Sequence, residues 1–185
     1  PRLSYANIIR DMRGKVWVNN RLATFDTPIK PGDTVKTGVK SQIIFVIGDD
    51  VYKLGARSTL RLRYNTGNRF VNAMRLVGGT LLGVFGNGRK TIQSPTTTIG
   101  IRGTGLFLKV EADNTYFCTC YGETEIYTRD KPRHQLVSTT HHTAYSISHH
   151  VQQPNVFSDT MKYHTDDELH YLESLVGRKP PASFK

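Results

Sequence analysis

The sequence predicts an all-β fold, arranged either as a two-sheet sandwich or as a solenoid-like stack of short strands. Short apolar or alternating segments recur at a spacing of about ten residues, as in all-β domains. Gly, Asn, Asp and Pro separate these segments, and such residues are typical of tight turns. Helical spacing is found near the C-terminus, in one short segment.

The pattern of single segments indicates which faces are buried. Val16 and Val18 alternate with Trp17, which predicts a strand with one apolar face. Residues 42–47 form a continuous apolar run that ends at a glycine, which predicts a strand buried on both faces.

A basic stripe is expected in residues 57–63. Here Leu60 and Leu62 would take one strand face, while Arg57, Arg61 and Arg63 share the other. The first 110 residues carry 18 Lys and Arg against 5 Asp and Glu, within a chain of net charge +10. Such an excess attracts nucleic acid, anionic lipid or an acidic partner, although a solubilising surface is the more ordinary interpretation, and the three arginines are the candidate partner contacts.

One short helix is predicted at about residues 166–176. Thr165 and Glu168 have the spacing of a capping box, and Gly177 stands where a helix commonly ends. Leu169 and Leu172 belong to the apolar stripe of this helix. The stripe must pack on the β body or on a partner, and we expect these two leucines to contact a partner.

Between the strands and the helix, the strand pattern weakens. Residues 131–164 hold six of the seven histidines and only short apolar runs. We expect a long irregular arm over the surface, and loops of this length are usually functional. The chain is therefore divided into a β domain of residues 1–128 and an extension of residues 129–185.

The run TTTIGIRGTG, residues 96–105, combines β-branched residues with three glycines. β-branched residues disfavour the helix start that a phosphate-binding loop requires. The glycines instead suit places where two stretches of chain pass close together. A nucleotide site is therefore excluded here, and strands are expected.

Six segments in this order resemble FecR-type domains, a family named for the periplasmic regulator of ferric dicitrate transport. They are GKVWVN (14–19), KPGDTVKTGVKSQI (30–43), DDVYKLGARSTLRL (49–62), LVGGTLL (76–82), SPTTTIGIRGTGLFLKV (94–110) and TYFCTCYGETEI (115–126). The chain departs from the family pattern after the aspartates at 49 and 50, where the usual Ser or Thr is missing.

The resemblance implies a non-enzymatic domain of short strands that is exported to the periplasm or beyond, with a signal peptide upstream. In the transport regulators such domains relay a signal to an anti-sigma segment. This chain has no apolar run long enough to span a membrane. It therefore resembles the stand-alone exported members, and the regulatory role is not carried over.

Cys118 and Cys120 lie two residues apart on a predicted strand, so both thiols point to one face. A disulfide between them would be strained. Together with His141, His142 and His164 they could bind a transition metal or a haem. Covalent c-type haem is disfavoured, because the chain has no Cys-x-x-Cys-His motif. Two buried thiols beside a polar surface loop are the alternative interpretation.

Other function classes have little support. No base or orienting acid can be identified for the serines and cysteines, so no enzymatic activity is expected. No recognition helix or aromatic and basic motif points to nucleic acid. The first expectation is a binding or scaffolding module that recognises another envelope protein. The alternatives are a metal- or haem-binding protein and a structural subunit of a homo- or hetero-oligomer.

Overall fold

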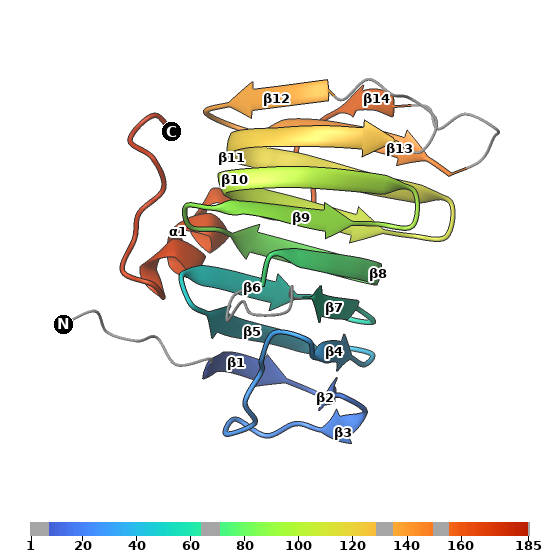
Figure 1. Cartoon of the computed structure of the whole chain (residues 1–185), viewed down its shortest axis with the longest axis vertical. Helices are drawn as coiled ribbons and strands as arrows, with labels where there is room; N and C mark the ends of the chain where they lie inside the picture. The colour runs from blue at the N-terminus through green and yellow to red at the C-terminus, as the bar shows by residue number, and fades with distance from the viewer. Residues whose placement is uncertain (1–7, 64–70, 129–134, 150–155, 185) are drawn as a thin grey trace.

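The computed structural model describes residues 8–63, 71–128, 135–149 and 156–184. In these residues the strands form one open 14-stranded sheet, and a single short helix lies near the C-terminus (Figure 1). The predicted β fold with one C-terminal helix is thus confirmed. In the described part of the chain, no helix is both long and apolar enough to cross a membrane.

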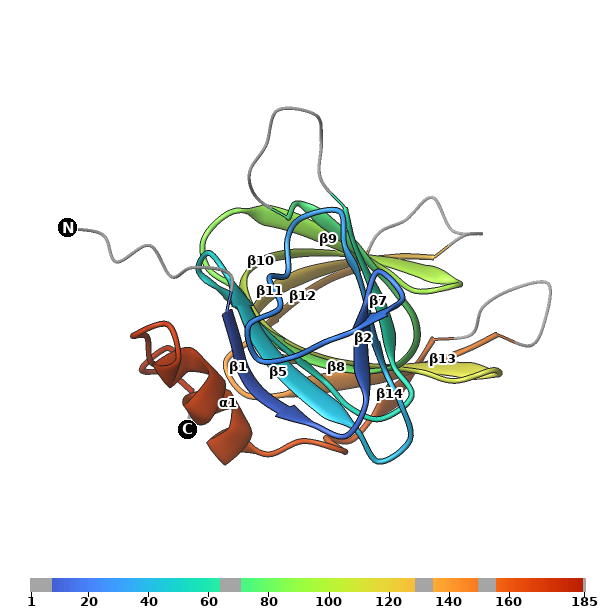
Figure 2. The same cartoon turned by 90° about the horizontal axis from the view of Figure 1, so that it is seen from below.

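The sheet folds over on itself, so that two layers face each other. Three long strands connect the layers, because one half of each strand lies in one layer and the other half lies in the second. They are β8 (Ala73–Val84), β10 (Thr97–Val110) and β11 (Asn114–Thr128). The first half of β10 pairs with β9 (Arg89–Gln93), whereas its second half pairs with β8. The strands thereby wind round a shared apolar interior (Figure 2).

We name the layers by what covers them. The helix-side layer consists of β1 (Ile8–Arg13), β5 (Gln42–Ile47), β6 (Asp50–Leu54), β13 (Thr143–Ser148), β14 (Val156–Asp159) and one half of each long strand. The open layer consists of β2 (Val16–Val18), β3 (Arg21–Leu22), β4 (Thr34–Thr37), β7 (Thr59–Arg63), β9, β12 (Gln135–Thr139) and the other halves. The sequence did not distinguish a two-sheet sandwich from a solenoid-like stack of strands. The structure has two layers, as in a sandwich, but one continuous sheet of successive strands forms both of them.

The interior between the layers is filled by the alternating apolar positions. Val16 and Val18 are buried there, as are Leu60 and Leu62 of β7. β5 is buried along almost its whole length, because α1 and the chain after it cover its outer side. These predictions from strand pattern are confirmed.

Glycines allow β10 and β11 to turn from one layer to the other. The pairing between the two strands shifts register on both sides of Gly105. Gly122 of β11 has a φ of +91°, and a Cβ atom there would lie 2.6 Å from the carbonyl oxygen of Gly103. Of the three glycines expected at a close passage of strands, Gly105 marks one, whereas Gly103 serves a positive φ of +55° and Gly100 has no neighbour closer than 3.7 Å.

Helix α1 (Asp166–Ser174) packs on the outer surface of the helix-side layer. Its capping box between Thr165 and Glu168 is present as predicted. Leu169 and Leu172 are fully buried in a second apolar cluster between helix and sheet. Their predicted role as partner contacts is therefore wrong, because the β body itself covers the stripe.

The predicted arm contributes strands to the sheet. β12 and β13 both pair with β11, and β14 pairs with β13. The sheet therefore continues across the expected domain boundary at residue 128. The first part of the arm, residues 129–134, lies outside the described residues.

Candidate metal centre

Cys118 and Cys120 lie on the face of β11 that points toward α1. Strand alternation places Phe117 in the interior of the sheet and both cysteines in the outer cluster. The two thiols are free and have no exposed surface. The prediction that they share one face is confirmed.

His142 reaches the cysteines from the turn between β12 and β13. The residue has a φ of +41°, and its backbone N–H donates to the carbonyl oxygen of Cys120 at 2.9 Å. This bond holds the turn against β11. The Nδ1 atom of His142 lies 3.5 Å from the Sγ atom of Cys118.

His164 approaches from the segment that leads into α1. The hydroxyl of Tyr116 accepts a hydrogen bond from the backbone N–H of Lys162 and donates one to the carbonyl oxygen of Thr160. The imidazole of His164 stacks on Phe107, with ring centres 4.9 Å apart. Its Nε2 atom lies 3.3 Å from the Sγ atom of Cys120.

The donor atoms of Cys118, Cys120, His142 and His164 all lie within 4.8 Å of one another. In a tetrahedral site with the bond lengths of zinc, two thiolates and two imidazoles place their donor atoms about 3.3–3.8 Å apart. The two sulfur–nitrogen distances fall in or near this range. Only a small contraction is needed for all four donors to bind one ion.

Both imidazoles are held by their second nitrogen. Nε2 of His142 lies 2.7 Å from Oδ1 of Asp166, and Nδ1 of His164 donates to the carbonyl oxygen of Lys162 at 2.7 Å. Histidine ligands of metals characteristically donate their second N–H to a carboxylate or carbonyl oxygen. The nitrogen facing the cysteines is then left with its lone pair.

The cluster shifts the pKa values of its own members. Hydrogen bonding to Cys120 and to the two imidazoles outweighs burial and lowers the pKa of Cys118 to about 4. Burial and the neighbouring Cys118 thiolate raise the pKa of Cys120. Burial also opposes the charged form of His142, but Cys118 and Asp166 raise the pKa of this imidazole overall. The cluster thus favours the thiolate form at Cys118 and disfavours it at Cys120.

Asp166 was not predicted as part of the site. In the sequence it reads as an acidic residue in the first helical turn, and only its position two residues after His164 could have drawn attention. Its other carboxylate oxygen lies 3.1 Å from Nε2 of His141. His141, predicted as a ligand, is therefore not one of the four buried donors; it contacts Asp166, which in turn contacts the donor His142.

No base or orienting acid could be identified from the sequence, but the structure places an imidazole and a carboxylate beside Cys118. The expected lack of enzymatic activity stays a prediction. His142 contacts Cys118 through Nδ1 and Asp166 through Nε2, and folding brings the three residues together from β11, a turn and α1. Sequence spacing alone does not reveal such a contact.

The three arginines of the expected basic stripe lie elsewhere, beside the open layer. Arg61 and Arg63 are exposed on β7, and Arg61 lies opposite Arg75 of β8. Arg57 lies in the turn before β7 with a φ of +51°. It is exposed but does not belong to the strand, because β7 begins at Thr59.

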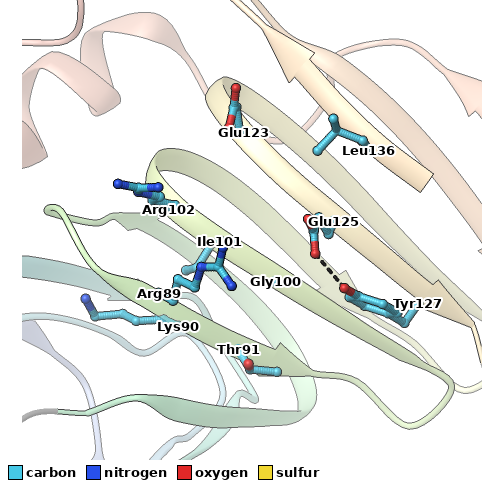
Figure 3. A pocket seen from close by; sticks show the side chains of 10 residues that line it. All are labelled: Arg89, Lys90, Thr91, Gly100, Ile101, Arg102, Glu123, Glu125, Tyr127 and Leu136. Atoms are coloured by element: carbon cyan, nitrogen blue, oxygen red, sulfur yellow. Dashed lines mark hydrogen bonds between the residues drawn. The ribbon is translucent and has the colours of Figure 1, made fainter. Parts of the chain in front are cut away.

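A shallow hollow of about 260 Å³ is also found on the open layer (Figure 3). Gly100 leaves its floor without a side chain, Arg89 and Arg102 lie on one side, and Glu123 and Glu125 come from β11. Charges of both signs line the hollow. It therefore provides a polar surface for contact and does not share residues with the Cys and His cluster.

Comparison with known proteins supports the fold. No family model and no curated protein matches the chain, so the resemblance to FecR-type domains stays a prediction. Two crystal structures of "a putative anti-sigma factor from Parabacteroides distasonis ATCC 8503" match with TM-scores of 0.57 and 0.58 at 9% and 8% identity. Each match covers 70% of this chain and 60% of the solved chain. The chain thus has the β fold of these proteins over part of their length.

Proposed function

We propose that this protein binds one transition-metal ion through Cys118, Cys120, His142 and His164. One observation carries the proposal: four donor atoms from three separate segments converge within 4.8 Å. The hydrogen bonds on the second nitrogen of each imidazole support it, because they hold both rings in the orientation that a metal needs.

The donor set favours zinc or a similar ion. Two thiolates and two imidazoles suit a tetrahedral ion of borderline softness, and a buried four-donor set is typical of structural zinc. Haem is less well supported, because the donors surround a space of ionic size. A bound metal would also protect adjacent thiols from oxidation, which matters if the protein is exported as its sequence suggests.

A thiol hydrolase is the rival that the geometry raises. Cys118, His142 and Asp166 have the order of nucleophile, base and orienting acid. The sulfur of Cys118, however, has no exposed surface. Cys120 and His164 fill the space beside it, where a substrate would have to approach. We therefore favour a non-enzymatic role.

Metal content tests the proposal directly. Elemental analysis and Co²⁺ titration of the reduced protein are expected to give one ion per chain. Cys118→Ser and Cys120→Ser should lose this ion, whereas His170→Ala should keep it, since His170 is an exposed histidine on α1 outside the four-donor set. A parent protein without stoichiometric metal would contradict the proposal.

Recognition of another envelope protein is a second candidate. The exposed arginines of the open layer and the fold shared with "a putative anti-sigma factor" favour a protein partner. Reversing charge at Arg61 and Arg63 should abolish cross-linking to this partner in the native cell. Arg10→Glu on β1 is the matched control, because Arg10 is exposed on the other layer. Unchanged cross-linking of the Arg61 and Arg63 variant would reject this surface.

Export and assembly remain part of the proposal. Cell fractionation distinguishes an exported protein from one retained in the cytoplasm. The solution mass distinguishes a single module from a structural subunit, whose copies would pair through edge strands such as β12 and β14.

A further inference from the structure

Aromatic side chains enclose the four donors. Phe107 stacks on His164, and the ring of Phe184 lies 5.6 Å from that of His142. Neither cysteine has exposed surface, and 5% of the His142 side chain is exposed. An ion from solvent therefore needs a defined path to reach the thiols.

Two further donor residues lie between this cluster and solvent. The side chains of His141 and Asp166 are 43% and 38% exposed. Oδ2 of Asp166 lies 3.1 Å from Nε2 of His141, and Oδ1 lies 2.7 Å from Nε2 of His142. The donor atoms of these three residues also lie within 4.8 Å of one another.

His142 belongs to both groups. Its Nδ1 atom faces Cys118 inside the cluster, while its Nε2 atom faces Asp166 at the edge. Donor atoms thus follow one another from the exposed ring of His141, through Asp166 and His142, to the buried sulfurs.

We propose that His141 and Asp166 form a loading port, where a metal ion binds in passing before it reaches the four buried donors. This inference rests on the proposed metal function and adds the route of entry. A carboxylate and an imidazole at the surface can replace part of the water shell of the ion. The thiolates then replace the remainder, so that dehydration takes place in two smaller steps.

A port has a kinetic property that a structural support lacks. A residue that touches the ion only in transit changes the rates of uptake and release by the same factor, and the affinity stays constant. A residue that supports the loaded site changes the affinity, since it stabilises the bound state. His141 is the residue for this test, because Asp166 also orients His142.

The experiment mixes reduced, metal-free, full-length protein with Co²⁺ in a stopped-flow instrument and follows thiolate-to-cobalt absorption. His141→Ala should slow uptake about tenfold, a small increase in the barrier, because the passing ion loses one of its two surface ligands and must give up more of its water before it meets the thiolates. Release to a chelator should slow by the same factor, and the dissociation constant and final spectrum should match those of the parent. His170→Ala is the control, because His141 and His170 both contact the ring of Phe184.

Each result decides a different question. Parental uptake in His141→Ala overturns the port and leaves the metal site intact. Weaker affinity at an unchanged uptake rate also overturns the port, because His141 would then stabilise the loaded site. A parent protein that takes up no Co²⁺ removes the proposed function and the port together. Circular dichroism of the variants establishes that they are folded.

Discussion

Two glycines of β10 have different surroundings, although they stand five residues apart. A Cβ atom at Gly105 would lie 2.6 Å from ring carbons of Tyr121, whereas one at Gly100 would meet nothing closer than 3.7 Å. Tyr121 cannot easily move away, since it is buried and its hydroxyl donates to Glu173 at 2.5 Å. The close passage of β10 and β11 therefore depends on Gly105.

Replacing these glycines by alanine should have unequal effects. Gly105→Ala is expected to lower the free energy of unfolding by about 1–3 kcal/mol, because the methyl group overpacks against Tyr121. Gly100→Ala should change it by less than about 0.5 kcal/mol. Urea unfolding of both variants measures the difference, and equal values would show that Tyr121 can relax.

Helix α1 is attached to the sheet by polar contacts as well as by its leucines. Nζ of Lys53 on β6 lies 2.5 Å from Oε1 of Glu168. Glu173 is buried, accepts from Tyr121 and pairs with Arg178. Arg178 also donates to the carbonyl oxygen of Asp49 and so attaches the chain after α1 to the body.

The attachment of α1 should depend on pH through Glu168. Burial raises the pKa of this carboxyl, but Lys53 and Thr165 outweigh burial and hold it below its ordinary value of 4.5. A lowered pKa means that the unfolded chain binds the proton more readily. The contribution to stability is therefore complete above pH 4.5 and is lost as the pH falls through the lower, folded-state value.

Glu168→Gln tests this contribution while keeping an amide that can serve the capping box. The variant should be less stable than the parent by about 0.5 kcal/mol at neutral pH, because the ion pair is partly exposed. The difference in the free energy of unfolding between parent and variant should become smaller below pH 4.5, as Glu168 is protonated. A double variant with Lys53→Met should lose little more than Glu168→Gln alone. A difference that is constant between neutral and acidic pH would contradict the ion-pair explanation.

The four donors of the metal site would join parts of the molecule that lie far apart in the sequence. Cys118 and Cys120 lie in the middle of β11, His142 lies in the turn before β13, and His164 precedes α1. A metal bound there would link the C-terminal part to the sheet. It would therefore stabilise the folded chain relative to the unfolded one.

Metal should consequently raise the stability of the whole protein. At a free Zn²⁺ concentration one hundred times the dissociation constant, the expected gain is up to about 2.7 kcal/mol. A chelator should remove the gain, and Cys118→Ser should not respond to either addition. Urea unfolding under reducing conditions measures this effect. An equal response of Cys118→Ser would mean that Zn²⁺ acts at another place.

Local features of the fold could be predicted from the sequence because they depend on neighbouring residues. The alternation of Leu60 and Leu62 with arginines indicated the faces of β7, and Thr165 with Glu168 marked the start of α1. The Cys-x-Cys spacing placed both thiols on one face for the same reason, since side chains alternate along a strand. All three predicted histidines lie at or beside this face. His142 and His164 contact the thiols directly, and His141 lies next to them.

Long-range arrangement could not be predicted in this way. The apolar stripe of α1 fits a partner or the chain's own sheet equally well, and only tertiary packing decided that Leu169 and Leu172 are covered internally. The arm lacks long apolar runs, yet β12 and β13 form strands because β11 offers them a free edge. Local sequence pattern was sufficient for the strands up to residue 128, for the helix and for the residue types of the site. That Asp166 meets His142 and that His141 stays outside follows from the packing of distant segments, because such contacts depend on how the whole sheet winds.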